Sequence, residues 1–381
     1  MDKDELRAWL RLSMAQGIGN QTARQLLACF GSPQAVFEQT ETTLRQVITG
    51  QQAQALLTPP NELAVQYTRT EQWLKHQPEI YRHALWTLGD PHYPAELLQL
   101  ADPPLMIYVA GQTQHALGHA VAIVGSRNPT PQGAQTAEQF GESLSAVGLG
   151  VISGLALGVD GAAHTGALRG GLARDAAASA QTHWHTVAVV GTGLDRVYPR
   201  QHQALAHHIA LQGLLISEYP LGTAPLAHHF PQRNRLIAAL GLGTLVVEAA
   251  LKSGSLITAK MALELGREVL AIPGSIHAPQ SHGCHALIRQ GAKLVETAQD
   301  VLEELQLAPQ QQLSLYTDKA KTDSCEHALL THMGYSPVSL DALQTRCELD
   351  TATLQAQLLT LELEGVVARL PGSLFQRVGF A

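Results

Sequence analysis

The stretch Ala120–Arg127, which reads AVAIVGSR, decides the fold class of this chain. A continuous apolar run ends at Gly125 and opens at once into the polar pair Ser126-Arg127. Further apolar runs end in the same way, in a small residue or an acid, at residues 150–154, 187–191, 214–218, 244–248 and 269–274. Because such runs, alternating with helical-period stretches, are typical of strands buried on both faces, the sequence predicts an α/β fold with a doubly wound, mostly parallel sheet.

Glycine-rich turns follow several of these runs and share one edge of the predicted sheet. They lie at Gly125–Arg127, Ser153–Ala156, Gly191–Gly193 and Pro273–Ser275. In such sheets ligands bind at the carboxyl ends of the strands, where these turns are expected. Glycines let a ligand approach the backbone, and the N-termini of the following helices favour an anion. The sequence therefore predicts a phosphate-binding edge.

The composition is that of a packed globular chain. Its 381 residues suffice for two or three domains, and 45% of them are hydrophobic. The charged start Met1–Glu5 is followed by no apolar segment, and no apolar run reaches the length of a membrane span. The four cysteines are scattered and form no CxxC pair, so we expect free thiols in a reducing cytoplasm and no zinc site.

The charge pattern excludes a basic domain. The formal net charge is −7, and the tail 323–381 carries three basic and seven acidic side chains. Bulk attraction to nucleic acid is therefore not expected. Any site for a polyanion must be a local cluster of Arg and Lys on an acidic body.

Changes in composition and periodicity divide the chain into a helical domain, a lead-in segment, the sheet domain, a glutamine-rich linker and a C-terminal domain. Their expected bounds, in that order, are 1–85, 86–112, 113–305, 306–322 and 323–381. The prolines of the lead-in and the short apolar run Met106–Val109 predict an edge strand. In the helical domain, Gly17–Asn20 enters the periodic run Gln21–Phe30, which is typical of half a helix-hairpin-helix motif or of a plain tight turn.

The C-terminal domain has the pattern of a winged helix. Its predicted helices and hairpin strands are Cys325–Met333, Leu340–Cys347, Thr351–Glu364 with Asp350 as N-cap, Val366–Leu370 and Phe375–Val378. The helix in the recognition position has no Arg or Lys over residues 351–359. This favours a protein-contact or regulatory role over DNA reading, and it argues against a transcription factor.

Candidate binding residues follow individual strands. The Ser126 hydroxyl and the Arg127 guanidinium are groups that bind phosphate. Asp160 and His164 lie one helical turn apart and could contact each other, as a helix cap beside a ligand or, with Ser153, as a hydrolase triad. The triad is disfavoured because Ser153 does not lie in a GxSxG elbow.

Further cations stand at the starts of helices. Arg200 is expected over the strand ends, and Lys252 and Ser253 are phosphate-binding types. Arg233 and Arg235 oppose a helix dipole and so need an external or acidic partner, for which Glu248 is a candidate. The spacing of His282-Gly283-Cys284-His285 fits no zinc set, so no metal and no cofactor are expected.

Taken together, these strings resemble the DNA-processing protein A family, also called Smf. The matching strings are VAIVGSR, ISGLALGVDGAAH, VAVVGTGLDRVYPR, LISEYPLGTAP, FPQRNRLIAAL, TLVVEAALKSGSLITAKMALELGREVLAIPG and HALIRQGAKLV, in order over about 121–295. The lead-in LGDPHYPAELLQLADPPLMIYVAG fits as well.

The resemblance implies an extended Rossmann-like domain that binds single-stranded DNA, pairs as a homodimer and loads the RecA recombinase during natural transformation, with no established catalysis. It places Arg127, Arg200 and the Ser153-Gly154 loop in the DNA groove. The apolar segment Leu263–Ile272 is the expected dimer face. The predicted DNA-binding set is Ser126, Arg127, Ser153, Gly154, His164, Arg200, Arg233, Arg235, Lys252 and Ser253.

Two features depart from this reading. Residues 172–185 form an insertion, expected as a loop at the amino-terminal edge of the sheet, opposite the groove. Gly241–Glu248 resembles the Gly-Gly-x-Gly-Thr-x-x-Glu string of nucleotide phosphoribohydrolases similar to lysine decarboxylase-like proteins. Because the leading Pro-Gly-Gly is replaced by Ala239-Leu240-Gly241, an enzyme of that kind is the alternative and not the preferred interpretation.

Overall fold

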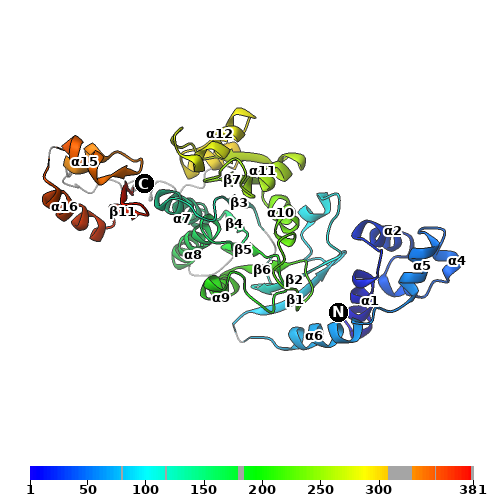
Figure 1. Cartoon of the computed structure of the whole chain (residues 1–381). Coiled ribbons are helices and arrows are strands. Elements are labelled where there is room, and N and C mark those ends of the chain that lie inside the picture. Colours follow the sequence, from blue (N-terminus) through cyan, green and yellow to red (C-terminus); the bar gives the residue numbers. More distant parts are fainter. Residues whose placement is uncertain (79, 116–117, 179–183, 308–327, 348, 379–381) are drawn as a thin grey trace.

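The structure is a computed structural model that describes residues 1–78, 80–115, 118–178, 184–307, 328–347 and 349–378. A helical N-terminal part, a central sheet domain and a small C-terminal domain follow one another along the molecule (Figure 1). Most of the linker expected at 306–322 lies outside the described residues, as does Cys325. In the described part of the chain, no helix is both long and apolar enough to cross a bilayer.

The N-terminal helices form a small bundle with its own core. They are α1 Lys3–Met14, α2 Asn20–Phe30, α3 Pro33–Phe37, α4 Glu41–Leu44, α5 Gly50–Leu57 and α6 Leu63–Lys75. Leu10, Leu12 and Leu26 are fully buried between them. The turn at Gly17 has a positive φ of 74°, and Asn20 at the start of α2 donates a hydrogen bond to Asp102 of the lead-in segment. Leu85 of β1 and Met106 and Tyr108 of β2 belong to the same hydrophobic cluster as the helices, so the bundle packs on the edge of the sheet.

In the described residues, one large sheet contains every strand expected from the apolar runs. Its strands are β1 Arg82–Thr87, β2 Met106–Gly111, β3 Ala120–Val124, β4 Gly150–Ser153, β5 Thr186–Val189, β6 Leu214–Ser217, β7 Gly243–Val246, β8 Glu268–Ala271 and β9 Lys293–Leu294. Their order is β1-β2-β6-β5-β4-β3-β7-β8-β9. The β1–β2 and β2–β6 pairs are antiparallel. The remaining strands, from β6 to β9 in the order of the sheet, are parallel to one another. The mostly parallel sheet is confirmed.

Two expectations about the edge of the sheet were wrong. Arg82–Thr87, assigned to the helical domain, is the edge strand β1. The strand at Met106–Gly111 is second in the sheet and buried along its whole length, because β1 covers its outer side.

Helices cover both faces of the sheet. The helices of this domain are α7 Pro131–Ala146, α8 Val159–Ala178, α9 Gln203–Gln212, α10 His229–Leu240, α11 Ser255–Glu264, α12 His282–Arg289 and α13 Ala298–Glu304. Ala122 and Val124 of β3 face the side of α10 and α11, whereas Val121 and Ile123 face α7 and α8. This alternation explains the continuous apolar run, since both faces of β3 are buried.

Helices α7 and α8 lie unusually close together. A Cβ at Gly166 would lie 1.8 Å from the carbonyl oxygen of Glu138, and one at Gly170 would lie 2.0 Å from that of Glu142. On the other helix, a Cβ at Gly141 would lie 2.4 Å from the carbonyl oxygen of Ala163. These glycines let the two backbones approach to a distance that a side chain would prevent.

The first half of the insertion at 172–185 is helical, so its prediction as a loop was wrong there; residues 179–183 lie outside the described residues. Its first seven residues, up to Ala178, complete α8. His185 at its end contacts the Asp175 carboxylate at 2.7 Å through Nε2. Trp184 is buried over Gly150, which begins β4, so the segment does lie at the amino-terminal edge.

The segment Leu263–Ile272, expected as a dimer face, is internal only in its strand part. It spans the end of α11 and strand β8, and β8 lies between β7 and β9. Val269, Leu270 and Ala271 are buried. Val269–Ala271 are therefore not available to a partner, whereas Leu263 at the end of α11 is 51% exposed, and the homodimer itself stays a prediction.

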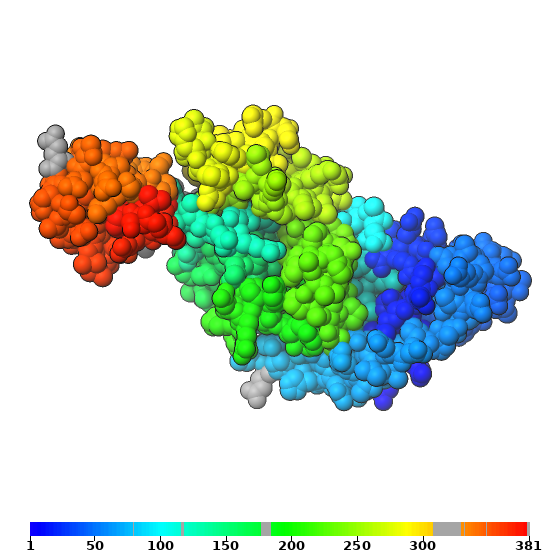
Figure 2. Space-filling model, viewed as in Figure 1, coloured from blue at the N-terminus to red at the C-terminus, as the bar shows by residue number. Residues whose placement is uncertain are grey.

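The C-terminal domain is a winged helix. It contains α14 Ala328–Met333, β10 Val338–Ser339, α15 Leu340–Cys347, α16 Thr351–Leu363, β11 Val367–Leu370 and β12 Leu374–Arg377. Asp350 caps α16 as expected, because its carboxylate accepts from the backbone N–H groups of Ala352 and Thr353. The C-terminal hairpin, red in Figure 2, lies against the sheet domain, where Gln376 donates to Gln132 of α7 at 3.1 Å.

Candidate functional site

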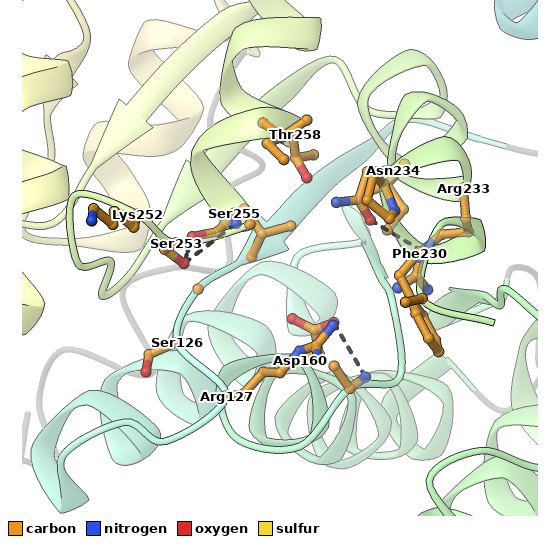
Figure 3. Close-up of a pocket in the computed structure, with 18 of the residues that line it drawn as sticks. Ser126, Arg127, Asp160, Phe230, Arg233, Asn234, Lys252, Ser253, Ser255 and Thr258 are labelled. Carbon is orange, nitrogen blue, oxygen red and sulfur yellow. Dashed lines mark hydrogen bonds between the residues drawn. The ribbon is translucent and has the colours of Figure 1, made fainter. Parts of the chain in front are cut away.

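A cavity of about 750 Å³ opens at the carboxyl edge of the sheet, as the glycine-rich turns predict (Figure 3). We call it the groove. Ser126 and Arg127 enter it from the loop after β3, and Lys252 and Ser253 enter it from the loop that leads into α11. Phe230 at the start of α10 forms part of its wall. With Arg233 of α10, which also lines the groove, five members of the predicted set therefore meet in one place.

The exposed cations of the groove are Arg127 and Lys252. Among the described residues, neither is in an ion pair, and both side chains are exposed. The Arg127 guanidinium lies 5.6 Å from the centre of the Phe230 ring. Ser253 and Ser255 place their hydroxyl oxygens 2.7 Å apart beside Lys252, where α11 begins. Free positive charge, hydroxyls and a helix N-terminus together suit a phosphate.

Arg233 has a different environment from the one expected. Its guanidinium is buried and donates to the carbonyl oxygens of Gly154, at 2.6 Å, and Val189. Asp160 accepts from the N–H groups of Gly154 and Ala156. Burial lowers the pKa of Arg233 to about 10, against the opposing charge of Asp160, and raises the pKa of Asp160. Arg233 and Asp160 therefore stabilise the backbone beside the groove through buried hydrogen bonds.

Ser153 and His164 are fully buried and do not reach the groove. Ser153 donates its hydroxyl to the Ile123 carbonyl at 2.6 Å. The His164 Nδ1 lies 2.7 Å from the Thr186 hydroxyl, and burial lowers the pKa of His164 to about 3. Because Asp160 serves the loop backbone instead, the suggested Asp160–His164 contact and the hydrolase triad have no support in this geometry.

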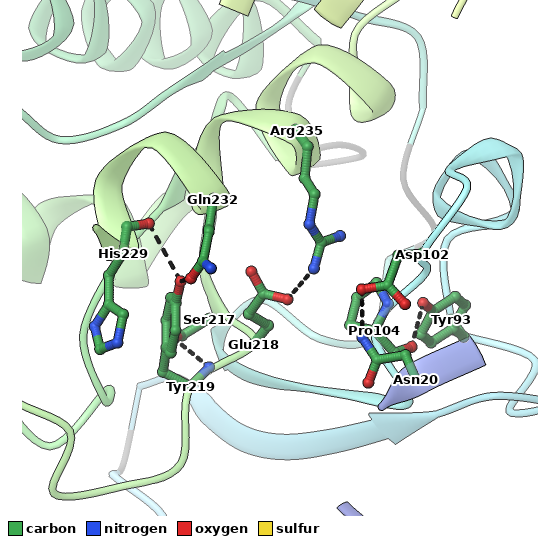
Figure 4. Close-up of polar contacts among 10 residues, drawn as sticks. All are labelled: Asn20, Tyr93, Asp102, Pro104, Ser217, Glu218, Tyr219, His229, Gln232 and Arg235. Carbon is green, nitrogen blue, oxygen red and sulfur yellow. Dashed lines mark hydrogen bonds and ion pairs between the residues drawn. The ribbon is translucent and has the colours of Figure 1, made fainter. Parts of the chain in front are cut away.

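Arg235 and Glu248 have separate partners, so the proposed pairing was wrong. Arg235 forms an ion pair with Glu218, which follows β6, on the side of α10 that faces the lead-in segment (Figure 4). Glu248 accepts from the Thr130 backbone N–H at 2.9 Å and from its hydroxyl at 2.6 Å. Glu248 therefore holds the residue that caps α7.

Arg200 lies outside the residues that line the groove. It is exposed in the short 3₁₀ helix Arg200–His202. Tyr198, two residues earlier, does line the groove, and its ring centre lies 5.5 Å from that of Phe230. Sequence reasoning named Arg200 and Arg233 as candidates but missed the neighbouring aromatic residues Tyr198 and Phe230. The signal was available, since each aromatic precedes its arginine by two or three positions.

The His282–His285 segment binds its own backbone. His282 and His285 each place Nε2 3.0 Å from a carbonyl oxygen, of Ile276 and Gly274 respectively. Cys284 is buried, and burial raises the pKa of its thiol to about 12. In the residues that the structure describes, no group of three His, Cys, Asp or Glu side chains is placed to hold a metal ion.

Comparison with known families agrees with the fold. Residues 84–306 match the DNA recombination-mediator protein A family, and residues 315–373 match the DprA winged helix domain. The chain belongs to the DprA/Smf family. Strand β2 and all but the first two residues of the edge strand β1 fall inside the first match.

Similar proteins cover most of the chain. Protein Smf of Escherichia coli is 38% identical over 379 residues, which is 96% of this chain and 94% of that protein. The DNA processing protein DprA of Streptococcus pneumoniae is 42% identical over 228 residues, covering 60% of this chain and 76% of that protein. The X-ray structure of the pneumococcal DprA matches with a TM-score of 0.63 at 34% identity and covers 80% of this chain and 98% of that one.

A further solved structure concerns DNA processing protein A of Helicobacter pylori and its single-stranded DNA binding mode. It matches with a TM-score of 0.51 at 29% identity, and it covers 59% of this chain and 95% of that one.

Proposed function

We propose that this DprA/Smf protein binds single-stranded DNA in the groove. The observation that carries the proposal is the pair of exposed cations, Arg127 and Lys252, beside the aromatic residues Phe230 and Tyr198. Phosphates need positive charge, and unpaired bases stack on aromatic rings, so a groove with both suits a single strand. The relative from Helicobacter pylori, whose solved structure concerns single-stranded DNA binding, supports the same ligand.

The charge of the rest of the chain favours a single strand over a duplex. The net charge is −7, so long-range attraction to a stiff duplex is weak, whereas a local groove still concentrates positive potential. A flexible strand can bend into such a groove and expose its bases to Phe230. Of the remaining predicted residues, Gly154 acts through its backbone, and Arg200 contacts the strand only beyond the groove.

The wider role follows from family membership. We propose that the protein is a recombination mediator that protects incoming single strands in the cytoplasm and loads RecA onto them during natural transformation. It acts without catalysis and as a homodimer. The phosphoribohydrolase alternative receives no support from the groove, because Glu248 is engaged by Thr130.

A binding titration across salt tests the DNA-binding proposal. The full chain is titrated against fluorescent single-stranded and duplex DNA of equal length. We expect tighter binding of the single strand, with a log–log salt slope of about −0.7 for each phosphate contact. Equal affinity for both forms, or no dependence on salt, would refute the proposal. Release of free base from a nucleoside monophosphate would instead revive the enzymatic alternative.

A further inference from the structure

A second cavity lies beside the groove, between the sheet domain and the winged helix; we call it the cleft. Its volume is about 810 Å³, within the range of about 300–1,000 Å³ that is usual for ligand sites. The sheet domain contributes the loops after β3 and β8, and the winged helix contributes Tyr335, Leu374 and Gln376. None of the predicted DNA-binding residues lines it.

The cleft continues the groove along the same edge of the sheet. Two loops line both cavities: the loop after β3 gives Ser126 and Arg127 to the groove and Asn128 and Pro129 to the cleft, and the loop after β7 gives Lys252 and Ser253 to the groove and Val247 and Glu248 to the cleft. A strand that leaves the groove past Arg127 therefore meets the cleft next.

Tyr335 has the arrangement of a stacking platform. Its side chain is 53% exposed at the cleft, although the winged helix could have buried it. The guanidinium of Arg377 lies 4.8 Å from the ring centre and covers one face of the ring. A ring supported on one side by a cation and open elsewhere is suited to stack on a nucleobase.

Gln376 supplies an unsatisfied acceptor in the lining of the cleft. The residue is 3% exposed, and its Nε2 donates to Gln132 Oε1 and to the Tyr335 carbonyl oxygen. Within the described part of the chain, its Oε1 has no hydrogen-bond partner. Buried acceptors are normally satisfied, and nucleobases carry N–H donors on their edges.

The charge of the cleft selects a base rather than a phosphate. Glu248 lines it with a carboxylate held by Thr130, and burial raises the pKa of that carboxyl. His277 is exposed at the rim, and among the described residues no Lys or Arg lines the cleft. Arg377 stands behind Tyr335. This lining suits a neutral ring better than a phosphate.

We propose that the cleft binds a nucleobase of the same single strand whose phosphates occupy the groove. Tyr335 stacks on the base, Gln376 Oε1 accepts its N–H, and Arg377 contacts the adjoining phosphate. This inference rests on the proposed function and adds a second subsite to it. It also places the DNA contact of the winged helix on the hairpin that carries Arg369 and Arg377, and not on α16, which has no Arg or Lys.

Binding of oligonucleotides of two lengths tests the subsite in the full chain. Oligothymidylates of about four and about sixteen nucleotides span the usual range of site sizes. Tyr335→Ala should weaken binding of the long strand about 5- to 150-fold, the range for loss of one stacked base, and leave the short strand unchanged. Tyr335→Phe should restore the affinity. Equal binding of the long strand by wild type and Tyr335→Ala would overturn the proposal.

A matched pair of arginines separates contact from general charge. Arg377→Gln should reduce the salt slope for the long strand by about 0.7. Arg369→Gln removes the same charge from the same hairpin, where Arg369 stacks on Phe375 away from the cleft, and should leave the slope unchanged. An equal reduction in both variants would overturn the proposed contact.

Photocrosslinking identifies the source of the base. A long strand that carries iodouracil at one position should crosslink to Tyr335 in a position-dependent manner. Crosslinking by free iodouridine monophosphate, with none by the strand, would overturn the proposal in favour of a mononucleotide site. Arg127→Ala is the reference variant. If it also leaves binding of both lengths intact, the proposed groove fails, whereas loss with Arg127→Ala and none with Tyr335→Ala refutes the cleft alone.

Discussion

Replacing Arg127 by alanine is the most direct perturbation of the groove. The side chain is exposed, is in no ion pair within the described residues and lies 5.6 Å from the Phe230 ring centre. Its removal takes away one charge-assisted phosphate contact, about 1.5–3 kcal/mol, reduced by solvent exposure, and a cation–π contact of about 0.5 kcal/mol. We expect a loss of about 1–3 kcal/mol, or about 5- to 150-fold in Kd.

Fluorescence anisotropy with a labelled single strand at several salt concentrations measures this loss. The salt slope should also fall by about 0.7, since one phosphate contact disappears. The free energy of unfolding should change by less than about 0.5 kcal/mol, because the side chain is exposed. Arg289→Ala is the matched control, since Arg289 is an exposed arginine that does not line the groove.

Arg200→Ala provides a graded comparison. From the family resemblance, alanine substitution of Arg200 and of Arg127 should cost the same free energy of DNA binding. Arg200, however, does not line the groove. The geometry therefore predicts a smaller loss for Arg200→Ala than for Arg127→Ala. Normal DNA binding by Arg127→Ala, or a loss that only accompanies unfolding of the variant, would refute the reasoning.

Further predictions concern the buried polar groups. Arg233→Ala should lower the free energy of unfolding by about 3–5 kcal/mol in urea titrations, because it leaves Asp160 buried without its opposing charge. Since burial lowers the pKa of His164 to about 3, only the unfolded chain binds this proton between about pH 6 and 4. The free energy of unfolding should therefore decrease by about 1.4 kcal/mol for each unit by which the pH is lowered through this window. His164→Asn should remove this dependence on pH. Glu248→Ala should cost about 1–3 kcal/mol of stability, measured in the same way, because it leaves the Thr130 N–H and hydroxyl unpaired.

The sheet was predictable because its signal is local. Each inner parallel strand is buried on both faces, so Ala120–Val124 and its counterparts appear as continuous apolar runs ending in glycine or a polar residue. Arg82–Thr87 escaped notice because an edge strand needs fewer apolar residues, and its first residue is exposed. The same reasoning explains the insertion. Nothing in residues 172–178 breaks a helix, and tertiary packing, which the sequence does not display, sets where α8 ends.

The groove was predictable in place but not in detail. Parallel topology brings the turns after β3 and β7 to one edge, which is why Arg127 and Lys252 meet. Residue type alone could not separate an arginine that faces solvent from one that faces two carbonyl groups. Arg233 and Arg127 have the same chemistry, and only the depth of α10 against β5 makes Arg233 a structural residue.

The close approach of α7 and α8 has a consequence for how this fold varies. With Gly141, Gly166 and Gly170 at the contact, neither helix can shift or rotate without driving backbone atoms together. The ends of these helices that face the groove are therefore fixed. The opposite end of α8 continues past this contact into residues 172–178, the first part of the predicted insertion. A change of length at that end of α8 would therefore leave the spacing of the loops that line the groove unchanged.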